Sequence, residues 1–155
     1  MGKKSLKPFI VSVIAILAIS GLVGWITSGS MAEYEAVQKS SLTPPSFVFP
    51  IVWTILYVLM GISAAMIYQS NSPKKKTALR IFIIQLLVNY FWSILFFNLQ
   101  MYGLAFFWLL LLWVLIIAMI VWFWPINQKA ALLQIPYLIW VTFAGYLSFV
   151  VWMLN

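Results

Sequence analysis

The stretch GLAFFWLLLLWVLIIAMIVWFW, from Gly103 to Trp124, decides the class of fold. It contains no charged, amide or hydroxyl side chain, so a water-soluble domain would have to bury it on every face. A helix needs roughly 20 apolar residues to cross a hydrocarbon core about 30 Å thick, and this stretch is long enough. It therefore predicts a transmembrane helix.

Four more apolar runs of similar length occupy most of the remaining chain, each bounded by Pro, Gly, Ser, Asn or Lys. The five runs cover approximately residues 8–28, 46–68, 78–99, 103–124 and 130–154. They are too long for barrel strands, and backbone groups in lipid must be bonded internally, so each run is predicted as a helix. With 65% hydrophobic and 7% charged residues, residues 1–155 are predicted to form one all-α integral membrane domain, a five-transmembrane-helix bundle.

The basic residues predict the orientation of this bundle. Cytoplasmic loops are enriched in Lys and Arg, so the N-terminus is expected in the cytoplasm and the C-terminus outside. Only Lys39 falls on the outer side, and the inner side holds Lys3, Lys4, Lys7, Lys74, Lys75, Lys76, Arg80 and Lys129. This pattern accounts for the net charge of +7, so no nucleic-acid partner is expected.

The first apolar run could instead be a signal peptide. It is longer than the usual apolar region of about 7–15 residues, and no clear A-x-A cleavage site follows, so we expect it to be retained. Short loops and no recognisable transit segment indicate a bacterial plasma membrane. The long outer loop, residues 29–45, contains Tyr34 and the Pro44-Pro45 pair, and is expected to be an ordered lid over the outer end.

The composition excludes several kinds of chemistry. The chain has no Cys and no His, so no disulfide, thiolate, zinc or histidine-ligated haem site is expected, and no metal site is predicted. No Asp, Glu, Lys or Arg lies deep in a predicted span. An ion-driven transporter usually has such a residue, so binding or passive roles are favoured.

The third span carries a polar and aromatic stripe. Gln85, Asn89, Trp92, Ser93 and Phe96 recur every three or four residues and so share one face, which is expected to point into the bundle. One interpretation is hydrogen bonding between helices. The other is that the amide of Asn89, near the middle of the span, faces a cavity and donates a hydrogen bond to a ligand.

Trp53 and Trp140 lie too far inside their spans to belong to an interfacial aromatic belt. On antiparallel helices their depths converge in the outer half of the bundle, where two indoles would form a flat wall for a large aromatic ligand. The alternative is tight aromatic packing without a ligand. Pro136 lies inside the fifth run, so a kink that widens a cavity beside Trp140 is expected.

Pairs of small residues, Ser20 with Gly24, Gly61 with Ala65 and Ala144 with Ser148, are spaced for close helix contact. Such contact could occur within the bundle or in a homodimer.

Three blocks of residues resemble the translocator protein family, also called tryptophan-rich sensory proteins or peripheral benzodiazepine receptors. The resemblance covers nearly the whole chain. The blocks are Pro44-Pro45 with Phe49-Pro50, Trp53, Leu56-Tyr57 and Met60-Gly61; Gln85-Leu86 with Asn89, Trp92 and Phe96-Phe97; and Pro136-Tyr137-Leu138 with Trp140, Phe143-Ala144 and Leu147.

The resemblance implies a five-helix bundle, often a homodimer, with a pocket in its outer half. Such pockets bind porphyrins such as protoporphyrin IX and drugs of the benzodiazepine or isoquinoline-carboxamide type. The implied ligand-binding residues are Tyr34, Pro44, Trp53, Asn89, Trp92, Trp140 and Ala144. No cofactor is implied, since protoporphyrin IX would be the ligand or the substrate.

Two further activities are kept as alternatives to binding alone. Some bacterial members are reported to degrade protoporphyrin IX in light, and Trp53 and Trp140 would then be the matching catalytic residues. A passive transporter or channel for porphyrins or other small apolar ligands is the other alternative.

The sequence departs from the family pattern in three places. The loop reads Lys39-Ser40-Ser41-Leu42 and lacks a family aromatic, and Ser148 replaces the usual Asn. Phe149, Val150 and Met153 occupy the stretch where animal members carry a sterol pattern, so no sterol recognition is expected at the end of span 5.

Overall fold

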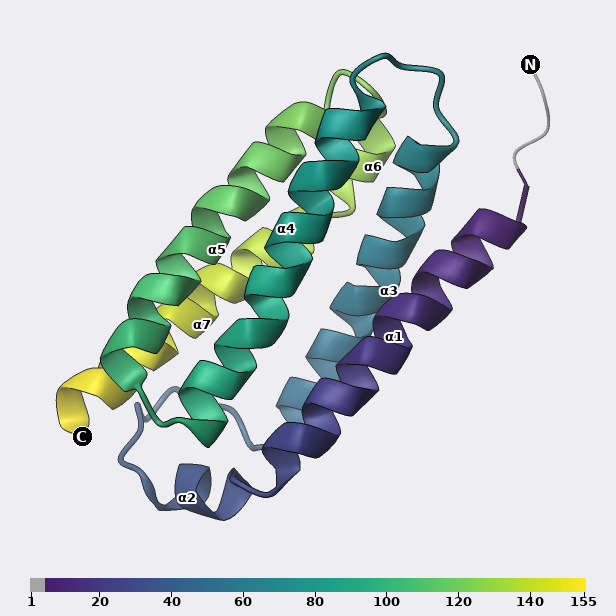
Figure 1. Cartoon of the computed structure of the whole chain (residues 1–155). Helices are drawn as coiled ribbons and strands as arrows, with labels where there is room; N and C mark the ends of the chain where they lie inside the picture. Colours follow the sequence, from purple (N-terminus) through teal and green to yellow (C-terminus); the bar gives the residue numbers. More distant parts are fainter. Residues whose placement is uncertain (1–4) are drawn as a thin grey trace.

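The computed structural model describes residues 5–155, and the predicted basic residues Lys3 and Lys4 lie outside that range. The described chain is helical throughout apart from its connections (Figure 1). The elements are α1 (Lys7–Ser28), α2 (Met31–Ala36), α3 (Val48–Tyr68), α4 (Lys75–Ser93), the π-helical turn η1 (Ile94–Asn98), α5 (Tyr102–Phe123), α6 (Gln128–Leu132) and α7 (Ile135–Leu154).

Five segments are long and apolar enough to cross a membrane, which confirms the predicted all-helical membrane protein with five candidate spans. Two of them combine consecutive elements, because η1 continues α4 and α6 leads into α7. The segments are Lys7–Ser28, Val48–Tyr68, Lys75–Asn98, Tyr102–Phe123 and Gln128–Leu154.

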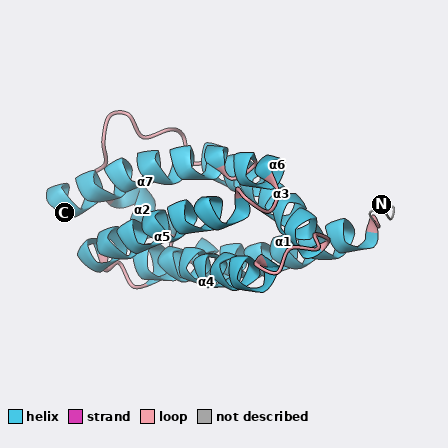
Figure 2. Ribbon diagram, turned by 90° about the horizontal axis from the view of Figure 1, so that it is seen from above, coloured by secondary structure: helices cyan, strands magenta, loops and turns pink. Residues whose placement is uncertain are grey.

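The helices run up and down, so the connections gather at two ends (Figure 1). One end holds the start of α1, the α3–α4 connection and α6, and we call it the basic end because Lys7, Lys74–Lys76 and Lys129 lie there. The opposite end holds α2, the η1–α5 connection and the C-terminus. Helix α5 lies between α4 and α7 (Figure 2) and contacts both.

Helix α1 is the peripheral member of the bundle. Only 6% of its apolar window is buried, against 28–44% for the other four spans. It is attached mainly to α3, where Gly61 lets the two backbones approach closely. A Cβ atom added at Gly61 would lie 2.8 Å from Val13 Cα, and Ser12 Oγ donates a 2.9 Å hydrogen bond to the Gly61 carbonyl. The small residue therefore serves a contact within the bundle.

The prediction of a kink within the helix at Pro136 is wrong. The chain instead breaks between two helices, and Pro136 stands in the first turn of α7, where no preceding carbonyl of the helix loses its partner. Asn127 begins the short helix α6 by accepting a 3.1 Å hydrogen bond from the Ala130 amide through its side chain. Trp140 consequently lies in a regular part of α7.

The close approach of α1 and α3 predicts that Gly61→Ala destabilises the protein by about 1–3 kcal/mol, because the added Cβ meets backbone that cannot move independently. Unfolding by a denaturing detergent in micelles measures this loss. Gly21→Ala on α1 is the matched control, since an added Cβ there meets nothing within 4 Å. Equal stability of the two variants would contradict the close packing.

Candidate functional site

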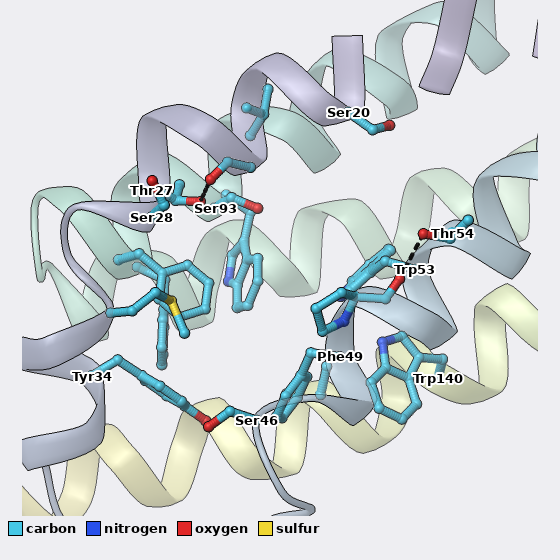
Figure 3. Close-up of a pocket in the computed structure, with 18 of the residues that line it drawn as sticks. Ser20, Thr27, Ser28, Tyr34, Ser46, Phe49, Trp53, Thr54, Ser93 and Trp140 are labelled. Carbon is cyan, nitrogen blue, oxygen red and sulfur yellow. Dashed lines mark hydrogen bonds between the residues drawn. The ribbon is translucent and has the colours of Figure 1, made fainter. Parts of the chain in front are cut away.

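A cavity of about 540 Å³ opens in the half of the bundle next to α2. This volume lies within the range of roughly 300–1,000 Å³ typical of sites for drug-sized ligands. Residues from α1, the long loop, α3, the α4–η1 segment and α7 line it, and several of their side chains are visible in Figure 3. Helix α5 contributes none of these lining residues and supports the cavity from behind.

Aromatic rings form much of the cavity wall. Trp53, Phe49 and Trp140 lie together on one side, and Tyr34 continues the wall beyond Phe49, with a distance of 6.4 Å between the ring centroids of Tyr34 and Phe49 (Figure 3). The ring centroids of Phe49 and Trp140 are 5.8 Å apart, and Trp53 stacks on Tyr57 at 5.5 Å. Rings held by such mutual contacts present rigid flat faces, which suits them to a planar aromatic ligand.

The α4–η1 segment supplies a second group of rings. Trp92 stacks on Phe96 at a centroid distance of 5.1 Å, and Phe97 meets Phe96 edge to face at 5.0 Å. Both phenylalanines belong to the π-helical turn, which changes the faces that successive side chains present. Such turns often occur at functional sites. The sequence stripe had placed Trp92 and Phe96 on one face but did not indicate the change of helix type.

The structure brings together most of the residues predicted for the site. Five line the cavity: Tyr34, Trp53, Trp92, Trp140 and Ala144. Pro44 is not among the lining residues, although its neighbour Thr43 is. Asn89 is also absent from the lining and lies behind Tyr57. Ligand contact by Pro44 and Asn89 stays a prediction.

Asn89 joins three helices through a buried hydrogen-bond network. The Tyr57 hydroxyl donates to Asn89 Oδ1 at 2.6 Å, and Asn89 Nδ2 donates to the Tyr137 hydroxyl at 2.7 Å. Tyr137 donates in turn to Gln85 Oε1 at 2.7 Å. Both ends of the Asn89 amide are therefore bonded to neighbouring helices, and Tyr57 carries this network to the cavity surface.

Helix α1 supplies a wall that the sequence reasoning missed. Ser20, Gly21, Gly24 and Thr27 all line the cavity. Of the pair predicted to make a helix contact, Ser20 does reach α4, where its hydroxyl lies 3.1 Å from that of Tyr90. A Cβ added at Gly21 or Gly24, in contrast, would meet nothing within 4 Å. The available signal was the recurrence of small and hydroxyl residues at intervals of three or four along an otherwise bulky helix.

The long loop covers the end of the cavity through Tyr34, which is only 8% exposed. Its ring lies 5.2 Å from that of Phe97, and Lys39 Nζ lies 4.7 Å above its centroid. The same ammonium donates to the carbonyls of Tyr34, Glu35 and Val37 at 2.8–3.1 Å, which closes the end of α2. Burial, with the nearby Glu35 carboxylate, raises the pKa of Tyr34 to about 12.

The loop is also tied to the C-terminus of the chain. Asn155 Nδ2 donates to the Gln38 carbonyl at 2.8 Å, and the Gln38 amide donates back to Asn155 Oδ1 at 3.2 Å. A further bond of 3.0 Å joins the hydroxyls of Ser40 and Tyr146. These contacts hold the loop across the cavity end as a lid.

The lining offers stacking surfaces and hydroxyl groups, with no Asp, Glu, Lys or Arg among its residues. In the part of the chain from residue 5 onward, no three His, Cys, Asp or Glu residues group as metal ligands would. Several hydroxyls are already bonded to their own helix, as Thr54 is to the Pro50 carbonyl at 2.7 Å. The lining of the cavity is therefore mainly apolar and aromatic, and it carries no charged side chain.

Fold and cavity together define an α-helical integral membrane protein with an aromatic ligand-sized cavity between its spans. The chain belongs to the TspO/MBR family, whose model matches residues 10–153. It is 38% identical to Protein CrtK of Rhodobacter capsulatus over 140 residues, 89% of this chain and 87% of that protein.

Two other relatives show how widely this similarity extends. The chain is 35% identical to the tryptophan-rich protein TspO of Archaeoglobus fulgidus over 147 residues, 94% of this chain and 95% of that protein. It is 33% identical to the translocator protein of Bos taurus over 125 residues, 79% and 74% of the two chains. The family resemblance read from the three sequence blocks is confirmed.

The network around Asn89 predicts that Asn89→Ala lowers the free energy of unfolding by about 1–2 kcal/mol, because two buried hydroxyls lose a partner. Tyr57→Phe removes only one of these bonds and is expected to cost less. Detergent unfolding of both variants checks the order. An Asn89→Ala variant as stable as the parent protein would show that the network does not hold the helices together.

The raised pKa of Tyr34 predicts that its hydroxyl ionises near pH 12, above the ordinary value of 10.0. Tyrosinate absorbance of the parent and of Tyr34→Phe should coincide up to about pH 11 and separate only near pH 12. The unfolded chain loses this proton first, so the residue contributes stability below pH 10 that is lost as pH rises towards 12. Separation of the curves near pH 10 would contradict the burial of Tyr34.

Proposed function

We propose that this protein binds a planar tetrapyrrole such as protoporphyrin IX in the aromatic cavity. The observation that carries the proposal is the placement of Trp53 and Trp140 on one wall of a ligand-sized cavity in a TspO/MBR-family chain. A macrocycle resting on these indoles would gain both burial and stacking. Aromatic drugs of the benzodiazepine or isoquinoline-carboxamide type would use the same wall.

The chemistry of the lining supports a metal-free porphyrin. Haem iron is usually held by His, Cys, Met or Tyr. The lining contains neither His nor Cys, and its Tyr57 hydroxyl is already bonded to Asn89, which leaves Met31 and Tyr34 as the remaining side chains of these types. A metal-free macrocycle has no iron to hold and therefore needs no such side chain. Its charged propionates, which are costly to bury in a lining without cations, would point towards the loop and the aqueous end.

The proposed setting follows from the charge distribution and from the family. The basic end would face the cytoplasm, which puts the cavity in the outer half of a bacterial plasma membrane. The functional unit would be a homodimer. The accessibility of each end of the bundle to a protease or a label, measured in oriented vesicles, tests the orientation independently of any ligand.

Two activities beyond binding are kept in the proposal. Light-dependent degradation of bound porphyrin is supported by the two indoles that would contact the macrocycle, Trp53 and Trp140. Passive transport of porphyrins or other small apolar ligands is the alternative. Flux into sealed proteoliposomes, compared with empty liposomes, would distinguish transport from the other two activities.

The proposal predicts that Trp53→Phe/Trp140→Phe binds protoporphyrin IX about tenfold more weakly, because two indoles lose part of their stacking surface. Binding is followed in dim light by quenching of tryptophan fluorescence. The matched control is Trp122→Phe/Trp124→Phe, which removes two indoles that are 37% and 46% exposed and do not line the cavity. The control is expected to bind as the parent does.

The same samples are then illuminated and their porphyrin absorbance is recorded. A new absorbing product that requires light and both cavity indoles would establish degradation, and an unchanged spectrum would leave a binding protein. Equal affinity of the two double mutants would overturn the assignment of the cavity. Absence of saturable binding by the parent would overturn the porphyrin proposal itself.

A further inference from the structure

Far from the cavity, the basic end carries positive charge with no negative partner. Lys74, Lys76 and Arg80 are exposed at the start of α4, and no ion pair reaches them within residues 5–155. The chain has only two acidic side chains, Glu33 and Glu35, and both lie in α2 at the other end of the bundle. The charges of this group therefore have no counter-ion from their own chain.

Lys75, between two of these residues, differs from them because its side chain is bonded within the protein. Its ammonium donates to the carbonyls of Tyr68 and Ser70 at 3.0 and 3.1 Å, which closes the end of α3. Lys74, Lys76 and Arg80 make no such side-chain bond in the described chain. Their charged groups are thus available to bind a molecule from outside the protein.

Two of these charges continue into an apolar line on the same helix face. Lys76 and Arg80 are four residues apart, and Ile83, Ile84 and Leu87 follow at the intervals that keep side chains on one side of a helix. These three apolar side chains are 51–62% exposed. Over ~16 Å this face of α4 therefore changes from cationic to apolar, as a phospholipid changes from head group to acyl chain.

We propose that this face of α4 binds one anionic phospholipid. The phosphate lies between Lys76 and Arg80, and an acyl chain follows Ile83, Ile84 and Leu87. A guanidinium matches a phosphate with two parallel hydrogen bonds, and an ammonium adds a compact second charge. Basic clusters next to a membrane span attract anionic lipids, and here no intramolecular acid competes for them.

Electrostatics within the helix favour the same occupant. Positive side chains repel one another, and they also oppose the positive end of the dipole of α4, whose first turn contains no acidic residue. A zwitterionic head group brings no net charge to relieve this repulsion, whereas a phosphatidylglycerol head group brings one negative charge. The site should therefore prefer the anionic lipid over a zwitterionic lipid with identical chains.

The test uses the full chain, purified in a neutral detergent and titrated with palmitoyl-oleoyl phosphatidylglycerol or with phosphatidylcholine of the same chains. Native mass spectrometry counts the lipids retained and the copies of the protein. The parent should retain one phosphatidylglycerol in preference to phosphatidylcholine. Lys76→Gln/Arg80→Gln should weaken this retention roughly 25-fold, since each basic residue near an anionic lipid contributes roughly fivefold.

Lys7→Gln/Lys129→Gln is the matched control, because it removes two charges from the same end but from other helices. It should retain phosphatidylglycerol as the parent does. Equal losses in the two double mutants would show diffuse attraction and overturn the site. Arg80→Lys keeps the charge but removes the planar guanidinium, so it should weaken lipid retention by an intermediate amount. This single variant keeps the test valid if the double mutant unfolds.

Two further measurements distinguish the phospholipid from other molecules that could occupy this face of α4. Inorganic phosphate at millimolar concentration should not displace the lipid, because it makes no contact with the apolar line; displacement would overturn the acyl-chain part of the site. A dimer that retains no lipid would show that a second copy covers this face and would overturn the proposal. Neither reading depends on porphyrin binding.

Discussion

The rest of the structure depends on one constraint: a polar group surrounded by hydrocarbon must find its partner inside the protein. It makes every span a helix, and it also governs a group of polar side chains where α3, α4 and α7 meet. Tyr57, Asn89 and Tyr137 bond to one another rather than to lipid and so join α3, α4 and α7 at fixed positions. The indoles of the cavity, Trp53, Trp92 and Trp140, stand on these three joined helices.

The cavity exists because α1 does not complete the same close packing. Gly61 holds α1 against α3 at Val13, towards the basic end, whereas Gly21 and Gly24 farther along α1 are too small to fill the space beside them. The space is then enclosed by rings from α3, η1 and α7 and covered by the loop that carries Tyr34. Tight packing towards one end and small residues towards the other thus yield a rigid bundle with room for a ligand.

The sequence predicted features that lipid enforces and missed those that depend on neighbours. Spans were visible because hydropathy alone decides them, and Trp53 and Trp140 could be brought together by counting depth along antiparallel helices. The role of α1 was missed, because its small and hydroxyl residues were interpreted as a helix contact, and hydropathy does not mark which face of such an apolar helix points inward. The break before Pro136 was missed although the proline itself was its local signal, since a helix usually ends at or before the residue that precedes a proline. The partners of Asn89 lie 32 and 48 residues away and needed coordinates.

The central claim is that a planar ligand rests against the indoles of this cavity. Fluorine NMR of the chain labelled with 5-fluorotryptophan tests it most directly, because each of the nine tryptophans reports its own surroundings. Protoporphyrin IX should shift the resonances of Trp53, Trp92 and Trp140 by its ring current and leave those of Trp122 and Trp124, outside the cavity, unchanged. Shifts confined to these outer tryptophans would contradict the account.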